Sequence, residues 1–221
     1  MKKGTPDMDK KTAGPMADRG RKALGFALAL TLAACAENTT TSSPIRNGYQ
    51  YISPTAQVVG GRLTVVTRIA WNESSLIDGN HGAPSWTVDG SSLDDLRFYI
   101  GIQDGTVMAS AKDANSTPIV FHSSMRPEET IVYFSERLSA QFNSQFRLES
   151  VEPYRFLQGD GFRFRYSLKR NSDQLTFDGI GYGAIRNGQL TAIVFTATRL
   201  GFYPRLADEV QKIADSATLK S

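Results

Sequence analysis

The side chains that could carry catalysis or bind a metal are few in this 221-residue sequence. There is one cysteine, Cys35, and there are two histidines, His81 and His122. A lone cysteine excludes a disulfide within the chain and a zinc site built on several thiolates, and two histidines exclude a three-histidine metal site. The sequence also lacks the H-E-x-x-H, G-x-S-x-G, P-loop and C-x-x-C motifs. We therefore expect no metal and no cofactor, and the sequence favours a protein that is not an enzyme.

One segment, residues 72–90, combines a histidine with carboxylates and an aromatic side chain. His81 follows Asp78 closely, and Trp86 and Asp89 come soon after. An imidazole beside a carboxylate can exchange protons near neutral pH, and aromatic side chains next to a loop can line a cleft. We expect a long irregular loop here, with His81, Trp86 and Asp89 as candidate ligand-binding residues. A hydrolase with its site in this loop is the alternative to a binding protein.

A run of alternating glycines, Gly179-Ile180-Gly181-Tyr182-Gly183, is the second candidate feature. It leads into a predicted Asn187-Gly188 hairpin turn rather than into a helix, so it does not match a dinucleotide-binding loop, which needs a helix N-terminus for the phosphates. In a strand, alternate residues share a face, so the three glycines form a smooth strip. Such a strip favours close packing of a helix or a bent strand. The alternative is a floor for a flat ligand around Gly181, as in a small-ligand carrier.

The first 34 residues have the three zones of an export signal. A basic stretch ends at residues 19–22, and the 12 residues 23–34 are uncharged and mostly apolar. As a helix this apolar run spans roughly 18 Å, which is short of the ~30 Å hydrocarbon core of a bilayer. The run therefore predicts a cleaved signal peptide rather than a permanent membrane span.

The signal ends in Leu32-Ala33-Ala34-Cys35, which resembles the lipobox of bacterial lipoproteins. The resemblance implies that a signal peptidase recognises Leu32, Ala33 and Ala34 and cuts before Cys35. It further implies that Cys35 carries acyl chains such as palmitate and attaches the protein to a membrane. Ala36 follows in place of an aspartate, which in Gram-negative lipoproteins implies the periplasmic face of the outer membrane.

Composition divides the rest of the chain into a tether and one domain. Residues 35–48 are polar and rich in Thr and Ser, which predicts a flexible tether, and residues 49–221 form the predicted domain. The formal charge of the whole chain is +3, but residues 1–34 hold seven of its 25 basic and three of its 22 acidic groups. The remainder has a charge of −1, so no nucleic-acid partner is expected.

The domain shows mainly strand patterns. We expect a hairpin around Gly60-Gly61, with Leu63 to Trp71 alternating onto one face, and short strands over 96–102 and 117–122. Phe162, Phe164, Tyr166 and Leu168 alternate with polar residues, and two further strands, 174–186 and 189–198, flank the Asn187-Gly188 turn.

Two helices are expected. Pro127 opens the first, because proline is favoured at the first helical position, and Ile131, Phe134, Leu138 and Phe142 give it one apolar stripe. Pro204 is expected to open the second. Its apolar face consists of Leu206, Val210, Ile213 and Ala217.

Basic residues line the polar face of the alternating strand. Arg163, Arg165 and Lys169 share that face, with Arg155 and Arg170 nearby. The pattern is typical of a solvated strand face. The alternative is a surface for an anionic partner such as lipid head groups or a glycan.

The order of elements predicts an α+β fold: an antiparallel sheet of about six to eight strands with a central helix and a C-terminal helix packed on it. This order resembles that of PsbP-like domains, which share a central helix, an antiparallel meander and a closing helix. The resemblance implies a binding or assembly role and brings no catalytic residues. We therefore expect a non-enzymatic envelope lipoprotein with a membrane and an envelope protein as its partners.

Overall fold

The computed structural model describes residues 48–74, 83–109 and 118–220. Its elements in chain order are β1 (Tyr49–Ile52), β2 (Ala56–Val59), β3 (Leu63–Val66), β4 (Trp71–Ser74), β5 (Ser85–Thr87), β6 (Asp94–Gln103), β7 (Val107–Ala109), β8 (Ile119–Val120), α1 (Pro127–Gln141), β9 (Ser144–Phe156), β10 (Gly159–Arg170), β11 (Thr176–Arg186), β12 (Gln189–Thr198), α2 (Phe202–Ser216) and β13 (Thr218–Leu219).

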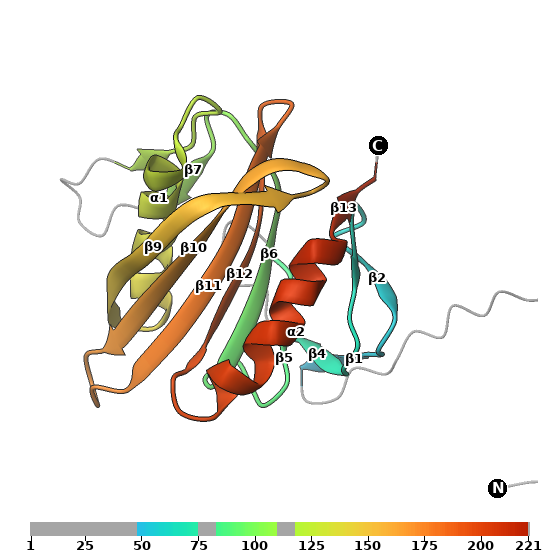
Figure 1. Ribbon diagram of the computed structural model, residues 1–221. Coiled ribbons are helices and arrows are strands. Elements are labelled where there is room, and N and C mark those ends of the chain that lie inside the picture. The colour runs from blue at the N-terminus through green and yellow to red at the C-terminus, as the bar shows by residue number, and fades with distance from the viewer. Residues whose placement is uncertain (1–47, 75–82, 110–117, 221) are drawn as a thin grey trace, which may run out of the picture. The chain divides into compact units, whose positions relative to one another are not determined.

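Antiparallel pairing dominates the described domain. The main sheet has eight strands in the order β1-β4-β5-β6-β12-β11-β10-β9, and two smaller sheets are β13-β3-β2 and β7-β8. Strands β9 to β12 are neighbours in both sequence and space, as a meander requires (Figure 1). The predicted α+β class, strand number and meander are confirmed.

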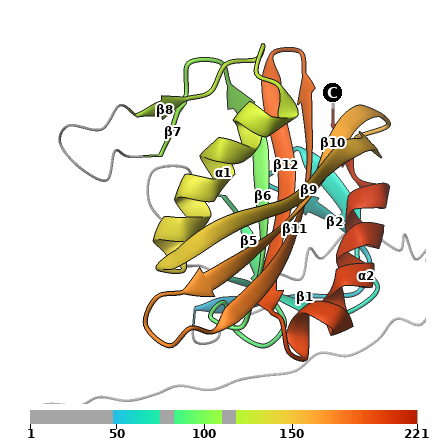
Figure 2. The ribbon, with the colours of Figure 1, turned by 60° about the vertical axis from the view of Figure 1, so that its left-hand side comes forward.

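The two helices cover opposite faces of the main sheet, as the views in Figures 1 and 2 show. On one face, Phe134 and Leu138 of α1 pack against sheet residues such as Phe164. On the other face, Val210 and Ile213 of α2 pack against a separate set of sheet side chains. The central strands are therefore buried on both faces, which explains why β12 has no exposed residue between Leu190 and Thr198.

Both helices bury the stripes that the sequence predicts. Pro127 is the first residue of α1, and the Arg126 backbone N–H donates to the Glu129 carboxylate at 2.8 Å, which closes the first turn. The second helix begins two residues earlier than expected, at Phe202, so that Pro204 is its third residue. Proline is tolerated there because the first-turn N–H groups have no partner within a helix.

The alternating glycines of β11 lie beneath aromatic rings of β10. Gly181 pairs with Phe164 and Gly179 with Tyr166, and a Cβ atom on either glycine would overlap the ring of its partner. The Tyr166 ring crosses Gly179, and its hydroxyl donates to the carbonyl of Phe195 on β12 at 3.0 Å. Close packing on the glycine strip is confirmed, with aromatic rings of the neighbouring strand in the place of the expected helix or bent strand.

The prediction of an irregular loop over residues 72–90 was wrong at both ends. β4 and β5 lie within that range, pair with each other and extend the main sheet. Ser85, Trp86 and Thr87 are all buried. β5 has only three residues, and its polar Ser85 and Thr87 are buried like Trp86. A strand this short, with polar residues inside the domain, gives no clear signal in the sequence.

The expected strand from Leu63 to Trp71 is also interrupted. β3 ends at Val66, and the Arg68 backbone N–H donates to the Glu209 carboxylate of α2 at 2.6 Å. The Trp71 indole N–H donates to the Thr67 hydroxyl at 2.9 Å. These hydrogen bonds stabilise a turn after β3, and the chain then enters the main sheet as β4.

We expect Gly181→Ala to lower the free energy of unfolding by about 2 kcal/mol, because the new methyl group must displace the Phe164 ring in a packed core. Urea denaturation followed by fluorescence measures the loss. The double variant Phe164→Leu/Gly181→Ala is the matched control, since a smaller side chain leaves room for the methyl group. The double variant should lose less free energy of unfolding than the sum of the losses in Gly181→Ala and Phe164→Leu. If the two losses simply added, the contact between Phe164 and Gly181 would not be the cause.

Candidate functional site

Two groups of predicted site residues lie outside the described residues. These are the lipobox residues Leu32, Ala33, Ala34 and Cys35, and His81 of the 72–90 segment. Their roles remain predictions.

The other predicted site residues do not come together. Trp86 is 1% exposed, and its ring packs edge-on against Phe98 with centroids 4.6 Å apart. Asp89 forms an ion pair with Arg205 of α2. Gly181 lies on β11, and two strands, β6 and β12, separate β11 from the β5 strand of Trp86. The Phe164 ring occupies the space over Gly181, so the interpretation of this glycine as the floor for a flat ligand was wrong.

A carboxylate that the sequence analysis did not single out organises the turn around Asp89. Asp94 is 1% exposed and accepts the backbone N–H groups of Val88 at 2.7 Å and Asp89 at 2.8 Å. Burial raises the pKa of Asp94 from 3.8 to about 6, although the hydrogen bonds from Val88 and Thr87 oppose the shift. Asp94 thus holds a turn in place at the edge of the core.

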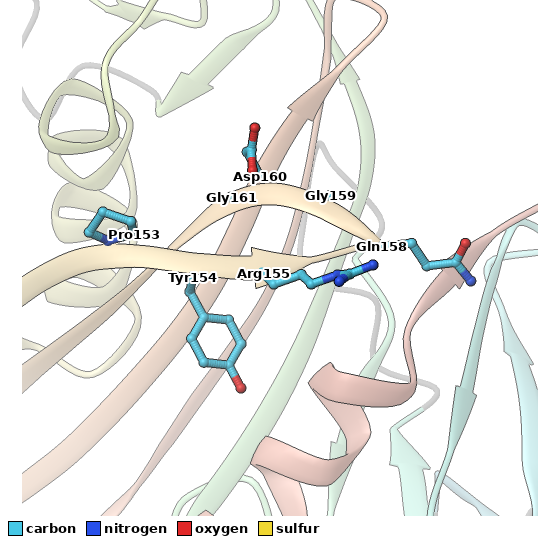
Figure 3. Close-up of a pocket in the computed structure, with 7 residues that line it drawn as sticks. All are labelled: Pro153, Tyr154, Arg155, Gln158, Gly159, Asp160 and Gly161. Atoms are coloured by element: carbon cyan, nitrogen blue, oxygen red, sulfur yellow. The ribbon is translucent and has the colours of Figure 1, made fainter.

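Three surface depressions gather around the tip of the β9–β10 hairpin. Their volumes are about 510, 540 and 470 Å³, and Gln158 lines all three. The hairpin extends past the sheet toward the C-terminal end of α2 and toward β13 (Figure 1). Figure 3 shows the first depression, with Tyr154 on the side facing α2, Pro153 and Asp160 on the opposite side, and Arg155 running toward the tip.

The tip itself has an unusual backbone. Leu157 and Gln158 form the two-residue turn, with φ values of +52° and +61°. Such a turn normally uses Asn or Gly, because a left-handed conformation costs other residues roughly 1–2 kcal/mol each. Leu157 packs against the core beside α2, which offsets part of that cost. Gln158 is exposed and gains no such burial.

A chain of polar contacts fixes the hairpin to α2. Glu152 and Arg163 form an ion pair at 2.7 Å, and the Arg163 guanidinium lies 4.8 Å from the centre of the Tyr154 ring. The Tyr154 hydroxyl donates to Asp215 of α2 at 2.5 Å. Burial and the Asp215 carboxylate raise the pKa of Tyr154 to about 12, so the hydroxyl keeps its proton at neutral pH. These contacts connect the projecting hairpin to α2 through Tyr154.

Several members of the predicted basic cluster have carboxylate partners. Arg163 pairs with Glu152, and Arg170 pairs with Asp173 at 2.6 Å. Arg163 lies on the predicted basic face, whereas Arg170 lies on the other face, with its guanidinium 5.3 Å from the centre of the Phe177 ring. A surface for an anion on this cluster stays a prediction. Among the described residues there is no group of three or more metal-ligating side chains. In the same part of the chain, no helix is long and apolar enough to cross a membrane.

The sequence matches no protein-family model and no curated protein. Among solved structures, the chain is similar to the solution structure of cyanobacterial PsbP (CyanoP) from Synechocystis sp. PCC 6803, with a TM-score of 0.52 and 10% sequence identity. The match covers 86% of this chain and 99% of that chain. The fold is PsbP-like. At this identity the similarity establishes the fold alone.

The free energy of unfolding should depend on pH between pH 4 and pH 6 because of the raised pKa of Asp94. Between pH 4 and pH 6 the folded protein binds more protons at Asp94 than the unfolded chain does, so its stability falls as pH rises through this range. The titration of Asp94 changes the free energy of unfolding by at most about 3 kcal/mol over this range. Asp94→Asn should flatten this part of the profile in urea denaturation monitored by tryptophan fluorescence.

Asp104→Asn is the matched control for that measurement. Asp104 is exposed, and hydrogen bonds from Ser123 lower its pKa below 3.8, so its contribution is lost only as pH falls below about 4. This variant should keep the wild-type slope between pH 4 and pH 6. An unchanged slope in Asp94→Asn would show that another group carries the dependence, with half-buried Glu73 next in line because burial also raises its pKa.

Proposed function

We propose that the protein is a non-enzymatic lipoprotein of the bacterial cell envelope, which displays a PsbP-like domain in the periplasm for binding or assembly. One observation carries the proposal: Cys35 stands directly after a basic stretch and a short apolar run, in the sequence Leu-Ala-Ala-Cys. The polar segment 36–48 would then link the acylated cysteine to the domain. The periplasmic face of the outer membrane is the proposed location.

The arrangement of the domain supports binding rather than catalysis. Of the two residues in the hydrolase hypothesis, Asp89 is paired with Arg205, and His81 lies outside the described residues. The buried carboxylates Asp94 and Glu209 hold backbone N–H groups of neighbouring turns. Their hydrogen bonds give both groups a structural role.

The β9–β10 tip is the proposed contact surface. It projects from the sheet, is fixed to α2 and carries Gln158 in a left-handed conformation. A projection that is already connected to a helix loses less conformational freedom when a partner binds than an unattached loop does, which favours affinity. Strained backbone is also commonly found at functional positions.

Acylation of Cys35 is tested by mass analysis of the processed chain after expression in a Gram-negative host. We expect cleavage between Ala34 and Cys35, and a mass increase of three acyl chains with one glyceryl group on residue 35. Cells fed an alkynyl palmitate analogue should label the wild type and Ser42→Ala, which alters only the tether, but not Cys35→Ala. An unmodified thiol at position 35, or a leader still attached, would refute the anchoring.

The binding role is tested by site-specific photo-crosslinking in intact cells. A photoreactive amino acid at Gln158 should give a reproducible crosslinked band with an envelope protein. Val132, which is 53% exposed on α1, is the matched control position and should give none. If both positions gave the same bands, or neither gave any, the hairpin tip would not be the contact surface.

A further inference from the structure

The geometry points to a binding site for a phosphate ester in the groove between the β9–β10 tip, the β11–β12 turn and β13, with Arg62 and Arg186 as its charged contacts. The groove has a volume of about 540 Å³, which is within the range of small-molecule sites. Three basic side chains, those of Arg62, Arg186 and Lys220, line it. Among the described residues, no carboxylate lines it.

Arg186 is held in place by the backbone of the hairpin tip. Its guanidinium donates to the carbonyl oxygens of Ile185 at 3.2 Å and of Asp160. The missing side chain of Gly159 makes room for it, because a Cβ atom there would overlap Nη2 of Arg186. The contacts orient the guanidinium without neutralising its charge.

Arg62 is positioned in the same manner from a distant part of the chain. A Cβ atom on Gly101 would lie 2.5 Å from Nη1 of Arg62, so this glycine also makes room for a guanidinium. Nη2 of Arg62 donates to the side-chain amide oxygen of Gln189 at 3.1 Å. The Lys220 backbone N–H donates to the Arg62 carbonyl at 2.8 Å, which brings the third basic residue to the same groove.

The partners of these two arginines differ from those of Arg163 and Arg199. Arg199 pairs with Asp178 at 2.7 Å, and Arg163 pairs with Glu152 at the same distance. In the groove the acceptors are neutral carbonyl and amide oxygens. The positive charge there is therefore not balanced by a neighbouring carboxylate within the part of the chain that the structure describes.

A phosphate ester matches this donor set. A guanidinium binds phosphate oxygens through paired N–H groups, and a phosphate monoester carries a charge of about −1.5 to −2 at pH 7. Amide and hydroxyl side chains complete the lining, including those of Gln158, Asn187 and Thr218. These neutral groups can bind hydroxyl groups of the esterified alcohol. A soluble sugar or glycerol phosphate carries such a monoester. A phospholipid head group such as phosphatidylglycerol offers phosphate oxygens as well, in a diester with a single negative charge.

Equilibrium dialysis of radiolabelled sn-glycerol 3-phosphate against the purified full chain in a neutral detergent tests the site. We expect saturable binding to one site. Arg62→Ala and Arg186→Ala should each weaken it about tenfold or more, the effect of losing a charge-assisted hydrogen bond. Gly159→Ala should weaken it as well, although the net charge is unchanged, because the methyl group moves the Arg186 guanidinium.

Two controls separate the groove from general surface charge. Lys169→Ala and Arg147→Ala remove one positive charge from exposed positions outside the groove, so binding should stay within twofold of wild type. Circular dichroism verifies that every variant is folded. The inference is overturned if no saturable binding occurs, if the controls lose as much affinity as Arg186→Ala, or if folded Gly159→Ala binds like the wild type.

Competitors identify the source of the phosphate. Displacement by inorganic phosphate and sn-glycerol 3-phosphate alone indicates a soluble ester. Displacement at lower concentrations by dihexanoyl phosphatidylglycerol, kept below its micelle-forming concentration, indicates a lipid head group. The groove residues lie outside the leader and the tether, so a negative result here leaves the proposed anchoring through Cys35 intact, and an unmodified Cys35 leaves this site intact.

Discussion

The rings of Phe164 and Tyr166 lie flat over Gly181 and Gly179, and the rest of the domain depends on that contact. The Phe164 ring also stacks on Phe134 of α1 with centroids 5.8 Å apart, so the same side chain joins two strands and a helix. Tyr166 reaches across Gly179 to hydrogen-bond with β12. Side chains on these glycines would lift the rings off the sheet and separate α1 from it.

Burial of the central strands on both faces sets the limits on where function can lie. Tyr182 of β11 and Phe195 of β12 face the α2 side and are fully buried, while the glycine strip faces the rings on the α1 side. The central strands therefore present no open surface to a ligand. Among the described residues, exposed polar groups lie at the sheet margins, in the turns, on the outer faces of the helices and on the hairpin that extends past the sheet.

Local patterns predicted the parts of the fold in which one face is polar and the other apolar. The alternation along β10, the Asn187-Gly188 turn and the stripe of α1 all belong to this kind. β5 escaped prediction because its residues are buried on both faces and two of them, Ser85 and Thr87, are polar. The basic groove escaped prediction for another reason: Arg62, Arg186 and Lys220 come from three distant segments, and only the pairing of β13 with β3 brings the last of them close to the first.

The β9–β10 and β11–β12 hairpins both have two-residue turns with positive φ values, but the residues in the two turns differ. Asn187-Gly188 takes positive φ values of +50° and +74° with little strain, since Asn and Gly tolerate this conformation. Leu157-Gln158 takes equivalent values at a greater cost. A two-residue turn alone does not require Leu157 and Gln158, because Asn and Gly adopt the same conformation at lower cost. Leu157 packs against the core cluster that includes α2 residues. Gln158 is exposed and lines three depressions, so burial in the domain does not offset the cost of its left-handed conformation.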